Sequence, residues 1–486
     1  MACGLFMLAA LAVRIHGIGD PLVVFHSLRH YRSALIARAC YDDATPGTPG
    51  WAVEIAHANR DIQQAGEPPI SEWIACTAYR AIGHEDLRIP RTLTAIWWIV
   101  GVIPLLLIAR RLISTNGALV ACALYLFLPY AIVATRTFQP DPLMTSCTLW
   151  AIAALLALHD HPRGRRLIAA ALAMGLALLV KPMSVFVVVP AALALARARE
   201  PWRRLVVDRN VWLLIGVGLI PPALYYGHSL FFGRLAQDQF QTRFVPSLLP
   251  TRFFWSGWLR QIHRVVGWPV AVAAAIGTAV AAQPLARRVL GAIWLGYVAF
   301  AVAFTYHMPT HDYYHLPFLP IAALAAAAAI DRVLSLAPAR AGVWLAAAFA
   351  CVIAVRGSTL AWPHLTLPHA AEIVADDERI GEATKHDGRV LFLDLEYGYP
   401  LMYHAQVAGD TWPGVDDLNA EHLDGLPALT AGARFARDYA DMHPRYFVVT
   451  DFDSLDAEHD LQQLLAAKTT LIDQTSRHRV YQFVNP

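Results

Sequence analysis

Long apolar runs alternate with short polar segments along the first three quarters of the chain. Eleven runs are apolar enough to cross the ~30 Å hydrocarbon core of a bilayer, although several fall short of the ~20 residues of an ideal spanning helix. They lie at 2–18, 93–109, 117–134, 142–158, 167–180, 183–197, 211–228, 265–282, 289–306, 315–330 and 342–357. The pattern predicts a polytopic α-helical membrane protein with about eleven transmembrane helices.

Arginines gather on one side of these predicted spans. If the N-terminus is cytoplasmic, every cytoplasmic loop is short and basic, as the positive-inside rule requires. These loops contain "ARRL", "HPRGRR", "RAREPWRR", "ARR" and "DRVLSLAPAR". An odd number of spans then places the C-terminus outside. The first run lacks a charged n-region and a cleavage site, so we interpret it as a retained helix and not as a signal peptide.

The pattern changes after about residue 358. "GRVLFLDLEYGYPLMYHA" predicts a buried strand and a helix, "PRYFVVTD" predicts a second strand, and "TLIDQTSRHRVYQFV" predicts two short paired strands. We therefore expect a transmembrane domain over 1–357, whose first external loop (19–92) carries juxtamembrane helices. A small external α/β domain should follow over 358–486.

Composition agrees with a membrane protein. Hydrophobic residues make up 57% of the 486 residues and charged residues only 16%, with a mean hydropathy of +0.42, whereas soluble domains average about a quarter charged. The net charge of +2 and the lack of a basic tail argue against nucleic acid as a partner. The six cysteines have no CxxC or paired spacing, so most should be small apolar residues inside helices. Only Cys40 and Cys76 share a loop, and a bridge between them is the less favoured alternative.

Two acidic motifs lie at predicted external helix ends. Asp141 stands between Pro140 and Pro142 at the start of a span, where a carboxylate costs free energy unless it is solvated or paired. It could cap the helix or serve a site. Glu67 and Glu72 lie in "GEPPISEW", where a carboxylate suits the first turn of a helix. A capped surface helix and a functional acid are both open for these two residues.

Two further motifs could bind ligands. "YHMPTHDYYHLPFLP" holds His311, Asp312 and His315, which could bind a divalent metal, although aromatic residues here also suit a membrane-interface belt. Lys181 in "KPMS" could extend to the membrane interface or bind a lipid phosphate.

The first external loop is unexpectedly basic. His26, Arg29 and His30 fall at i, i+3 and i+4, which is one face of a helix, and Arg32 is adjacent. This face could touch anionic headgroups, or it could line a cavity where a lipid phosphate arrives.

Together these motifs resemble bacterial glycosyltransferase family 39, which includes protein O-mannosyltransferase and lipid A aminoarabinose transferase relatives of the GT-C fold. The resemblance rests on "RIHGIGDP", "SALIAR", "EPPISEW", "RTFQPDPLM", "KPMS" and "HDYYHLPFLP", which occur in the family's order over roughly residues 10–330.

The resemblance implies a transferase in the bacterial inner membrane, with its active site and C-terminal domain on the periplasmic side. Such enzymes move a sugar from a polyprenyl-phosphate donor to an acceptor hydroxyl of a lipid, glycan or protein. Cations stabilise the departing lipid phosphate, and a carboxylate acts as general base in one inverting displacement. No cofactor is certain, and a divalent metal stays an open alternative. Membrane lipids are the other expected partners.

The resemblance also implies roles for individual residues. Asp141 matches the family's acid in the second external loop, and Lys181 a residue near the carrier phosphate. However, Arg29 and His30 stand where the family has an Asp-Glu pair, so we hypothesise that Glu67 or Glu72 supplies the second carboxylate, with Asp20 less favoured. The expected phosphate-binding residues are Arg29, Arg32, Arg136, Lys181, His311, Tyr313 and Tyr314.

Two other classes of function stay open. A polytopic transporter or flippase would also need many apolar spans, but its ionisable residues usually lie near the membrane midplane. A non-catalytic relative that binds lipid carriers would fit the missing Asp-Glu pair.

Overall fold

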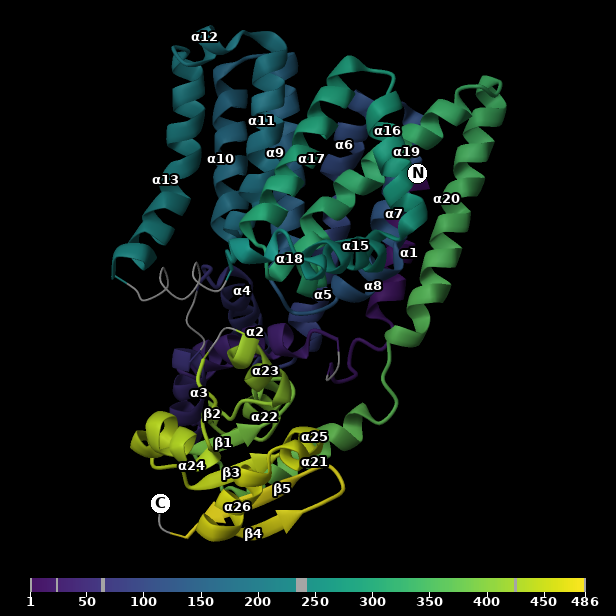
Figure 1. Ribbon diagram of the computed structural model, residues 1–486. Coiled ribbons are helices and arrows are strands. Elements are labelled where there is room, and N and C mark those ends of the chain that lie inside the picture. The colour runs from purple at the N-terminus through teal and green to yellow at the C-terminus, as the bar shows by residue number, and fades with distance from the viewer. Residues whose placement is uncertain (1, 23–24, 63–65, 233–242, 424–425, 485–486) are drawn as a thin grey trace. The chain divides into compact units, whose positions relative to one another are not determined.

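The structure is a computed structural model that describes residues 2–22, 25–62, 66–232, 243–423 and 426–484 (Figure 1). Contacts divide the chain into two compact units. Unit 1 consists of Met1–Ile18, Ala65–Ile70 and Arg91–Thr366, and unit 2 of Gly19–Gln64, Ser71–Pro90 and Leu367–Pro486. The helices of the first loop thus share a unit with the C-terminal tail, and the domain limits drawn from the sequence stay a prediction.

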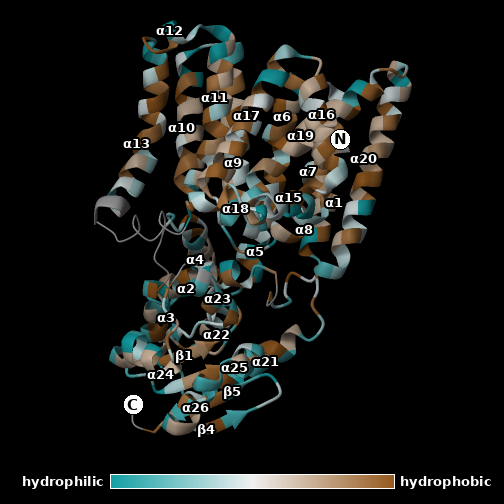
Figure 2. Cartoon of the chain, in the orientation of Figure 1, coloured by the Kyte–Doolittle hydropathy of each residue, from teal (hydrophilic) through white to brown (hydrophobic). Residues whose placement is uncertain are grey.

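Unit 1 is a set of apolar helices joined by short turns (Figure 2). Each of the eleven predicted spans coincides with helix, and this agreement confirms the predicted class of polytopic helical membrane protein. The helices are α1 (Ala2–Ile15), α5 (Arg88–Val100), α6 (Val102–Leu112), α7 (Thr115–Phe127), α8 (Pro129–Ala134), α9 (Asp141–Asp160), α10 (Gly164–Val180), η1 (Pro182–Ser184), α11 (Val185–Arg199), α12 (Trp202–Leu205), α13 (Arg209–Phe232), η2 (Pro246–Leu248), α15 (Arg252–Val266), α16 (Trp268–Val280), α17 (Pro284–Ala303), α18 (His307–Thr310), η3 (Asp312–Phe318), α19 (Leu319–Leu334), α20 (Ala339–Ala361) and η4 (Trp362–His364).

Not every apolar run is one straight span. Within the described residues, seven helices are long and apolar enough to cross a bilayer, and α15 with α16 would make an eighth despite a 95° bend. That bend lies at Gly267, whose φ of 76° favours glycine. The segment over 252–264 lies between two predicted spans and forms most of helix α15. The predicted span 117–134 is also divided, because Leu128 precedes Pro129 and takes an extended conformation with ψ of 131°.

Close helix packing in unit 1 depends on small residues. α16 packs against α19, where a Cβ added at Gly277 would collide with the carbonyl oxygen of Ala325. Membrane helices gain little from the hydrophobic effect between themselves, so close backbone approach supplies packing energy instead. Gly357 of α20 approaches Phe127 of α7 in the same way.

Unit 2 is built on a five-stranded sheet of order β2-β1-β3-β5-β4. β2, β1 and β3 are parallel, whereas β5 pairs antiparallel with both β3 and β4. The tail predicted as α/β therefore forms a mixed sheet that ends in the expected hairpin. The strands are β1 (Val390–Leu393), β2 (Gly409–Thr411), β3 (Tyr446–Val449), β4 (Thr469–Gln474) and β5 (Arg479–Phe483). The helices are α2 (Ser27–Asp42), α3 (Gly50–Ile62), α4 (Ile70–Ile82), α21 (Ala370–Ala383), α22 (Tyr399–His404), α23 (Val415–Leu423), α24 (Ala431–Arg434), η5 (Phe435–Tyr439), η6 (Ala440–Met442), α25 (Phe452–Ala457) and α26 (His459–Lys468).

The first-loop helix α2 is joined to the tail by a polar network. Arg38 forms an ion pair with Glu85 at 2.9 Å and lies 3.7 Å over the ring centroid of Tyr403. The Tyr31 hydroxyl is 2.7 Å from Nε2 of His404. The contacts with Tyr403 and His404 link segments more than 350 residues apart, which explains why α2 belongs to unit 2.

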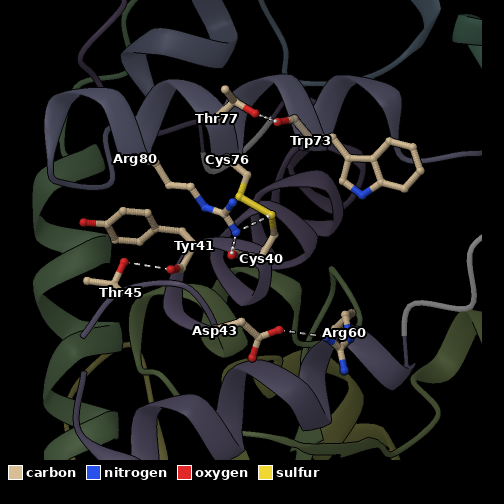
Figure 3. The surroundings of a disulfide bond; sticks show 9 residues. All are labelled: Cys40, Tyr41, Asp43, Thr45, Arg60, Trp73, Cys76, Thr77 and Arg80. Carbon is tan, nitrogen blue, oxygen red and sulfur yellow. Dashed lines mark hydrogen bonds and ion pairs between the residues drawn. A yellow bond between two sulfur atoms is a disulfide. The ribbon is translucent and has the colours of Figure 1, made fainter. Parts of the chain in front are cut away.

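Cys40 of α2 and Cys76 of α4 form a disulfide, with their Cα atoms 6.0 Å apart (Figure 3). The expectation that these cysteines are unpaired is wrong, because the packing of two helices decides the pairing and the spacing of 36 residues does not reveal it. Arg80 donates a 3.0 Å hydrogen bond to the carbonyl of Cys40 beside the bridge.

Removing the bridge should destabilise unit 2. We expect Cys40→Ser with Cys76→Ser to lower the free energy of unfolding by about 2–4 kcal/mol, because the closed loop restricts the unfolded chain. Thermal unfolding of the full chain in detergent measures the loss. Cys351→Ser, at an exposed free cysteine, is the control. Equal stability of the double variant and the control would contradict this role.

Unit 2 also buries an acid, Asp377, on α21. It is 6% exposed, and within the described residues its Oδ2 atom has no hydrogen-bond partner. Burial, followed by the nearby carboxylate of Asp394, raises the pKa of Asp377 to about 8. The folded protein thus keeps a proton that the unfolded chain loses near pH 4.

This difference predicts a pH dependence. Between about pH 4 and 8 unfolding releases a proton from Asp377, so its contribution to the free energy of unfolding falls as pH rises, by up to about 1.4 kcal/mol per pH unit. Asp377→Asn should remove that contribution. As the pH rises from 5 to about 8, the free energy of unfolding of the wild-type protein should fall relative to that of Asp377→Asn. Unfolding curves of both proteins measure this difference. A difference that does not change with pH would contradict the prediction.

Candidate active site

Asp141 and Lys181 form a buried ion pair in unit 1. The Lys181 Nζ atom lies 2.9 Å from Oδ1 and 3.0 Å from Oδ2 of Asp141. The side chains are only 5% and 2% exposed. Lys181 lies at the break between α10 and η1, where the following proline, Pro182, holds it in an extended conformation. The break therefore places an ammonium group beside the first residue of α9.

Glu67 and Tyr313 complete this cluster. The Glu67 Oε1 atom is 3.6 Å from Lys181 Nζ, and its side chain is 19% exposed. Nζ also lies 5.8 Å from the ring centroid of Tyr313. Four residues singled out in the sequence thus meet, and one ammonium is shared by two carboxylates. We call Glu67, Asp141, Lys181 and Tyr313 the charged cluster.

The simpler interpretations of two of these residues are wrong. Asp141 does not cap α9, because Pro140 holds the N-cap position and no side-chain cap hydrogen bond forms there. Lys181 does not extend to the membrane interface, since it is buried and paired. The positive N-terminal end of α9 adds further stabilisation to the Asp141 carboxylate.

The segment after α18 supplies an aromatic wall. The rings of His307 and His311 stack with centroids 4.9 Å apart, and Tyr313 and Tyr314 follow at 5.0 Å from each other. Tyr314 is buried and stacks on Phe300. These contacts give His311 and Tyr314 packing roles, and their predicted phosphate contacts stay a prediction.

The candidate metal ligands do not converge. Asp312 pairs with Arg264 at 3.0 Å and accepts a 2.9 Å hydrogen bond from Tyr130. His315 is bonded at both ring nitrogens, to the Tyr297 hydroxyl and the Met308 carbonyl. Across the described ranges, no group of three or more His, Cys, Asp or Glu side chains is placed to hold a metal. His311, Asp312 and His315 therefore form no metal centre in this part of the chain.

Arg136 contacts main chain. Its Nη1 and Nη2 atoms donate hydrogen bonds of 2.9 and 2.7 Å to the carbonyls of Leu365 and Gly17, and the residue is 1% exposed. These bonds fix segments that are distant in sequence. They do not bring Arg136 to Lys181, and its role at a phosphate stays a prediction without support from these contacts.

The remaining candidates lie in unit 2. Glu72 of α4 is buried and accepts a 2.6 Å hydrogen bond from the Ser33 hydroxyl of α2. Arg29 and Arg32 are half-buried on α2, so the predicted helix over this stretch is present. It begins after His26, which is the N-cap residue. Phosphate binding by the two arginines stays a prediction.

Sequence reasoning missed two buried arginines. Arg14 of α1 donates 2.8 Å hydrogen bonds to the Thr135 hydroxyl and to the carbonyl of Leu126. Arg91 donates to the carbonyl of Ile18 at 2.6 Å. A cation inside an apolar run is the signal that could have revealed Arg14, because such residues in membrane helices find partners. Both help to fix the turn that precedes Asp141.

An apolar cavity of about 350 Å³ lies between α15, α16, α17 and α19. Val265, Trp294, Tyr297, His315 and Ala322 are among its lining residues. His315 lies on η3, the element that also carries Tyr313 of the charged cluster. The charged cluster and the cavity are therefore joined by one short helix.

This fold is the GT-C membrane fold, in agreement with the resemblance seen in the sequence. Residues 66–226, which include Glu67, Asp141 and Lys181, match the family described as dolichyl-phosphate-mannose-protein mannosyltransferase. No curated protein sequence gives a significant match.

Solved structures carry the likeness over nearly the whole chain. ArnT from Cupriavidus metallidurans in the apo state superposes with a TM-score of 0.61 at 16% identity, covering 98% of this chain and 97% of that chain. ArnT bound to undecaprenyl phosphate gives a TM-score of 0.62 at the same identity and coverage. The Archaeoglobus fulgidus oligosaccharyltransferase in complex with Zn and sulfate gives 0.56 at 14% identity, covering 93% of this chain and 68% of that chain.

The sharing of Lys181 predicts an asymmetry between two variants. Lys181→Met leaves two carboxylates facing each other and should lower the free energy of unfolding by about 3–5 kcal/mol. Asp141→Asn should cost less, because Lys181 keeps Glu67 as a partner. Combining both changes should recover part of the loss. Thermal unfolding in detergent measures all three.

A control for this comparison is Arg204→Met, at an exposed ion pair with Glu200 that should contribute about 1 kcal/mol or less. A Lys181→Met variant that is no less stable than this control would show that the buried pair does not stabilise unit 1.

Proposed function

We propose that the protein is a glycosyltransferase that moves a sugar from a polyprenyl-phosphate donor to an acceptor hydroxyl outside the membrane. The observation that carries the proposal is the charged cluster, in which Asp141, Lys181 and Glu67 meet inside a GT-C fold. ArnT, which has the same fold, has been seen with undecaprenyl phosphate bound. That lipid is the model for the donor's carrier.

The cluster suits the chemistry of this transfer. The acceptor oxygen bonds to the anomeric carbon as the bond from that carbon to the phosphate oxygen breaks, which inverts the anomeric centre. Lys181 can bind the phosphate, whose negative charge grows as it departs. One carboxylate, assigned here to Asp141, accepts the proton of the acceptor hydroxyl. The Glu67 carboxylate lies 3.6 Å from Lys181 Nζ and so helps to hold the ammonium group in position.

The neighbouring cavity suits the carrier's hydrocarbon chain. Its lining is largely aliphatic and aromatic, and a polyprenyl chain has no polar groups to satisfy there. Because η3 joins this cavity to Tyr313, a carrier with its phosphate at Lys181 would have an apolar site nearby for its first isoprene units.

The disulfide supports an external position for unit 2. Such bridges persist in the oxidising compartments outside the cytoplasm and are rare inside it. Cys40 and Cys76 lie beyond the first predicted span, where the arginine pattern places an external loop. Two independent signals therefore favour a cytoplasmic N-terminus, a periplasmic unit 2 and chemistry on the outer side of a bacterial inner membrane.

The assignment of Asp141 predicts a specific loss of activity. Asp141→Asn should lower transfer of a labelled sugar from an undecaprenyl-phosphate-linked donor by about 10²–10⁴-fold, because the general base is lost. Asp160→Asn, the same change at an exposed ion pair on the opposite end of α9, should keep full activity. Binding of undecaprenyl phosphate should survive in both variants, since Lys181 is unchanged.

The second carboxylate is tested in the same assay. We expect Glu67→Gln to reduce transfer more than Glu72→Gln does, because Glu67 lies 3.6 Å from Lys181 Nζ whereas Glu72 accepts a hydrogen bond from Ser33. If both variants retain transfer while Asp141→Asn loses it, the second-carboxylate role is wrong. If the wild-type protein binds the carrier but transfers no sugar from any donor, the chain is a non-catalytic carrier-binding relative, in line with its missing Asp-Glu pair.

A further inference from the structure

Unit 1 holds a second pocket, of about 400 Å³, at the far end of the helices from the charged cluster. It lies where α9 ends and α10 begins, beside the end of α11, the short helix α12 and the start of α13 (Figure 1). α9 has 20 residues and is about 30 Å long, with Asp141 at its other end. The pocket is therefore separate from the proposed active site, on the side that the arginine pattern predicts to be cytoplasmic.

One wall of this pocket is apolar. It is formed by leucine side chains from five helices, α9 to α13, and these side chains carry no polar group. A small hydrophilic ligand would leave this surface without favourable contacts, whereas acyl chains would fill it. The wall residues are Leu155, Leu158, Leu167, Leu195, Leu205 and Leu214.

The rim of the pocket is cationic. Arg163 and Arg199 both line it, and among the described residues neither makes an ion pair. Arg199 donates a 3.2 Å hydrogen bond through Nη1 to the carbonyl of His159, which fixes its guanidinium at the rim. The remaining nitrogens can bind an anion.

The acidic residues of the lining cancel only part of this charge. Glu200 is paired with Arg204 at 3.1 Å, a residue outside the lining. Oδ1 of Asp208 accepts a 2.8 Å hydrogen bond from the main-chain N–H of Asn210 at the start of α13. Arg204 thus neutralises Glu200, whereas Asp208 keeps its charge. Arg163, Arg199 and Asp208 together leave one net positive charge at the rim.

The surface around α12 and the start of α13, beside the pocket, has the composition of a membrane interface. The turn around α12 exposes Trp202, Val206, Val207 and Trp212 by 52%, 63%, 77% and 57%. The Trp212 indole N–H donates to the carbonyl of Val206, so these side chains form one surface. Tryptophan concentrates at headgroup depth in membrane proteins. The lining residues Leu205, Asp208 and Val211 belong to this same stretch, so this part of the pocket lies beside a predicted membrane interface.

We propose that this pocket binds an anionic phospholipid of the cytoplasmic leaflet. Its phosphate lies between Arg163 and Arg199, and its upper acyl chains lie against the leucine wall. Basic pockets between membrane helices on the cytoplasmic side suit such lipids, whereas a free phosphate would use only the rim. The lipid ties the ends of α9, α10, α11 and α13 together at the membrane surface.

The test uses the full-length protein in vesicles of equal parts phosphatidylcholine and phosphatidylglycerol. After solubilisation and washing, mass spectrometry measures the lipid that each protein retains. The wild-type protein is expected to retain phosphatidylglycerol in preference to phosphatidylcholine. Arg163→Gln with Arg199→Gln should lower that preference on the order of 30-fold, and each single variant should lose part of it.

A matched control is Arg165→Gln with Arg203→Gln, which removes the same charge from exposed arginines outside the lining. It should retain the wild-type preference. An equal loss in both double variants would show attraction to surface charge only, and an unchanged preference in the pocket variant would also overturn the proposal. Displacement of the lipid by inorganic phosphate at equal concentration would identify a phosphate site instead.

Discussion

The structure of unit 1 depends on one buried ammonium group shared by two carboxylates. Placing isolated charges in a low-dielectric interior costs several kcal/mol per ion, so Lys181, Asp141 and Glu67 are stable there only as a group. Their elements are far apart in the sequence, and the shared charge holds them together. Lys181 reaches this position because Pro182 ends α10 and keeps the preceding residue extended. A local steric rule thus positions the long-range interaction.

Buried arginines support the same region through the main chain. Arg14 donates to the carbonyl of Leu126 near the end of α7, Arg91 to that of Arg136 in the turn before Asp141, and Arg136 to that of Gly17 after α1. Carbonyls at helix breaks lack intrahelical partners and would otherwise stay unsatisfied in an apolar surrounding. These arginines therefore allow an irregular turn to exist among membrane helices. Arg136 has this structural task, and its expected role at a phosphate stays a prediction.

The chain keeps the fold of ArnT at 16% identity, and it departs from the resemblance in its first external loop. The resemblance predicts an acid pair at the positions of Arg29 and His30, and in the structure Glu67 contacts Lys181. If Glu67 supplies the second carboxylate, as we propose, that group comes from a different segment of the chain than in relatives. A fold can accommodate such an exchange because function depends on which groups meet in the site, and the scaffold fixes only where they can meet.

The sequence by itself determined the class of fold, because the period and length of apolar runs report burial locally. It predicted the helices of unit 1 and the strands of the tail, and it singled out Asp141 and Lys181 as candidate site residues. It did not reveal that these two residues form a pair, that Glu67 joins them or that Cys40 is bonded to Cys76. It also suggested a metal site where Asp312 and His315 are instead bound to Arg264 and Tyr297. Pairing between groups 36 or 40 residues apart depends on how helices pack, and only the tertiary structure decides that.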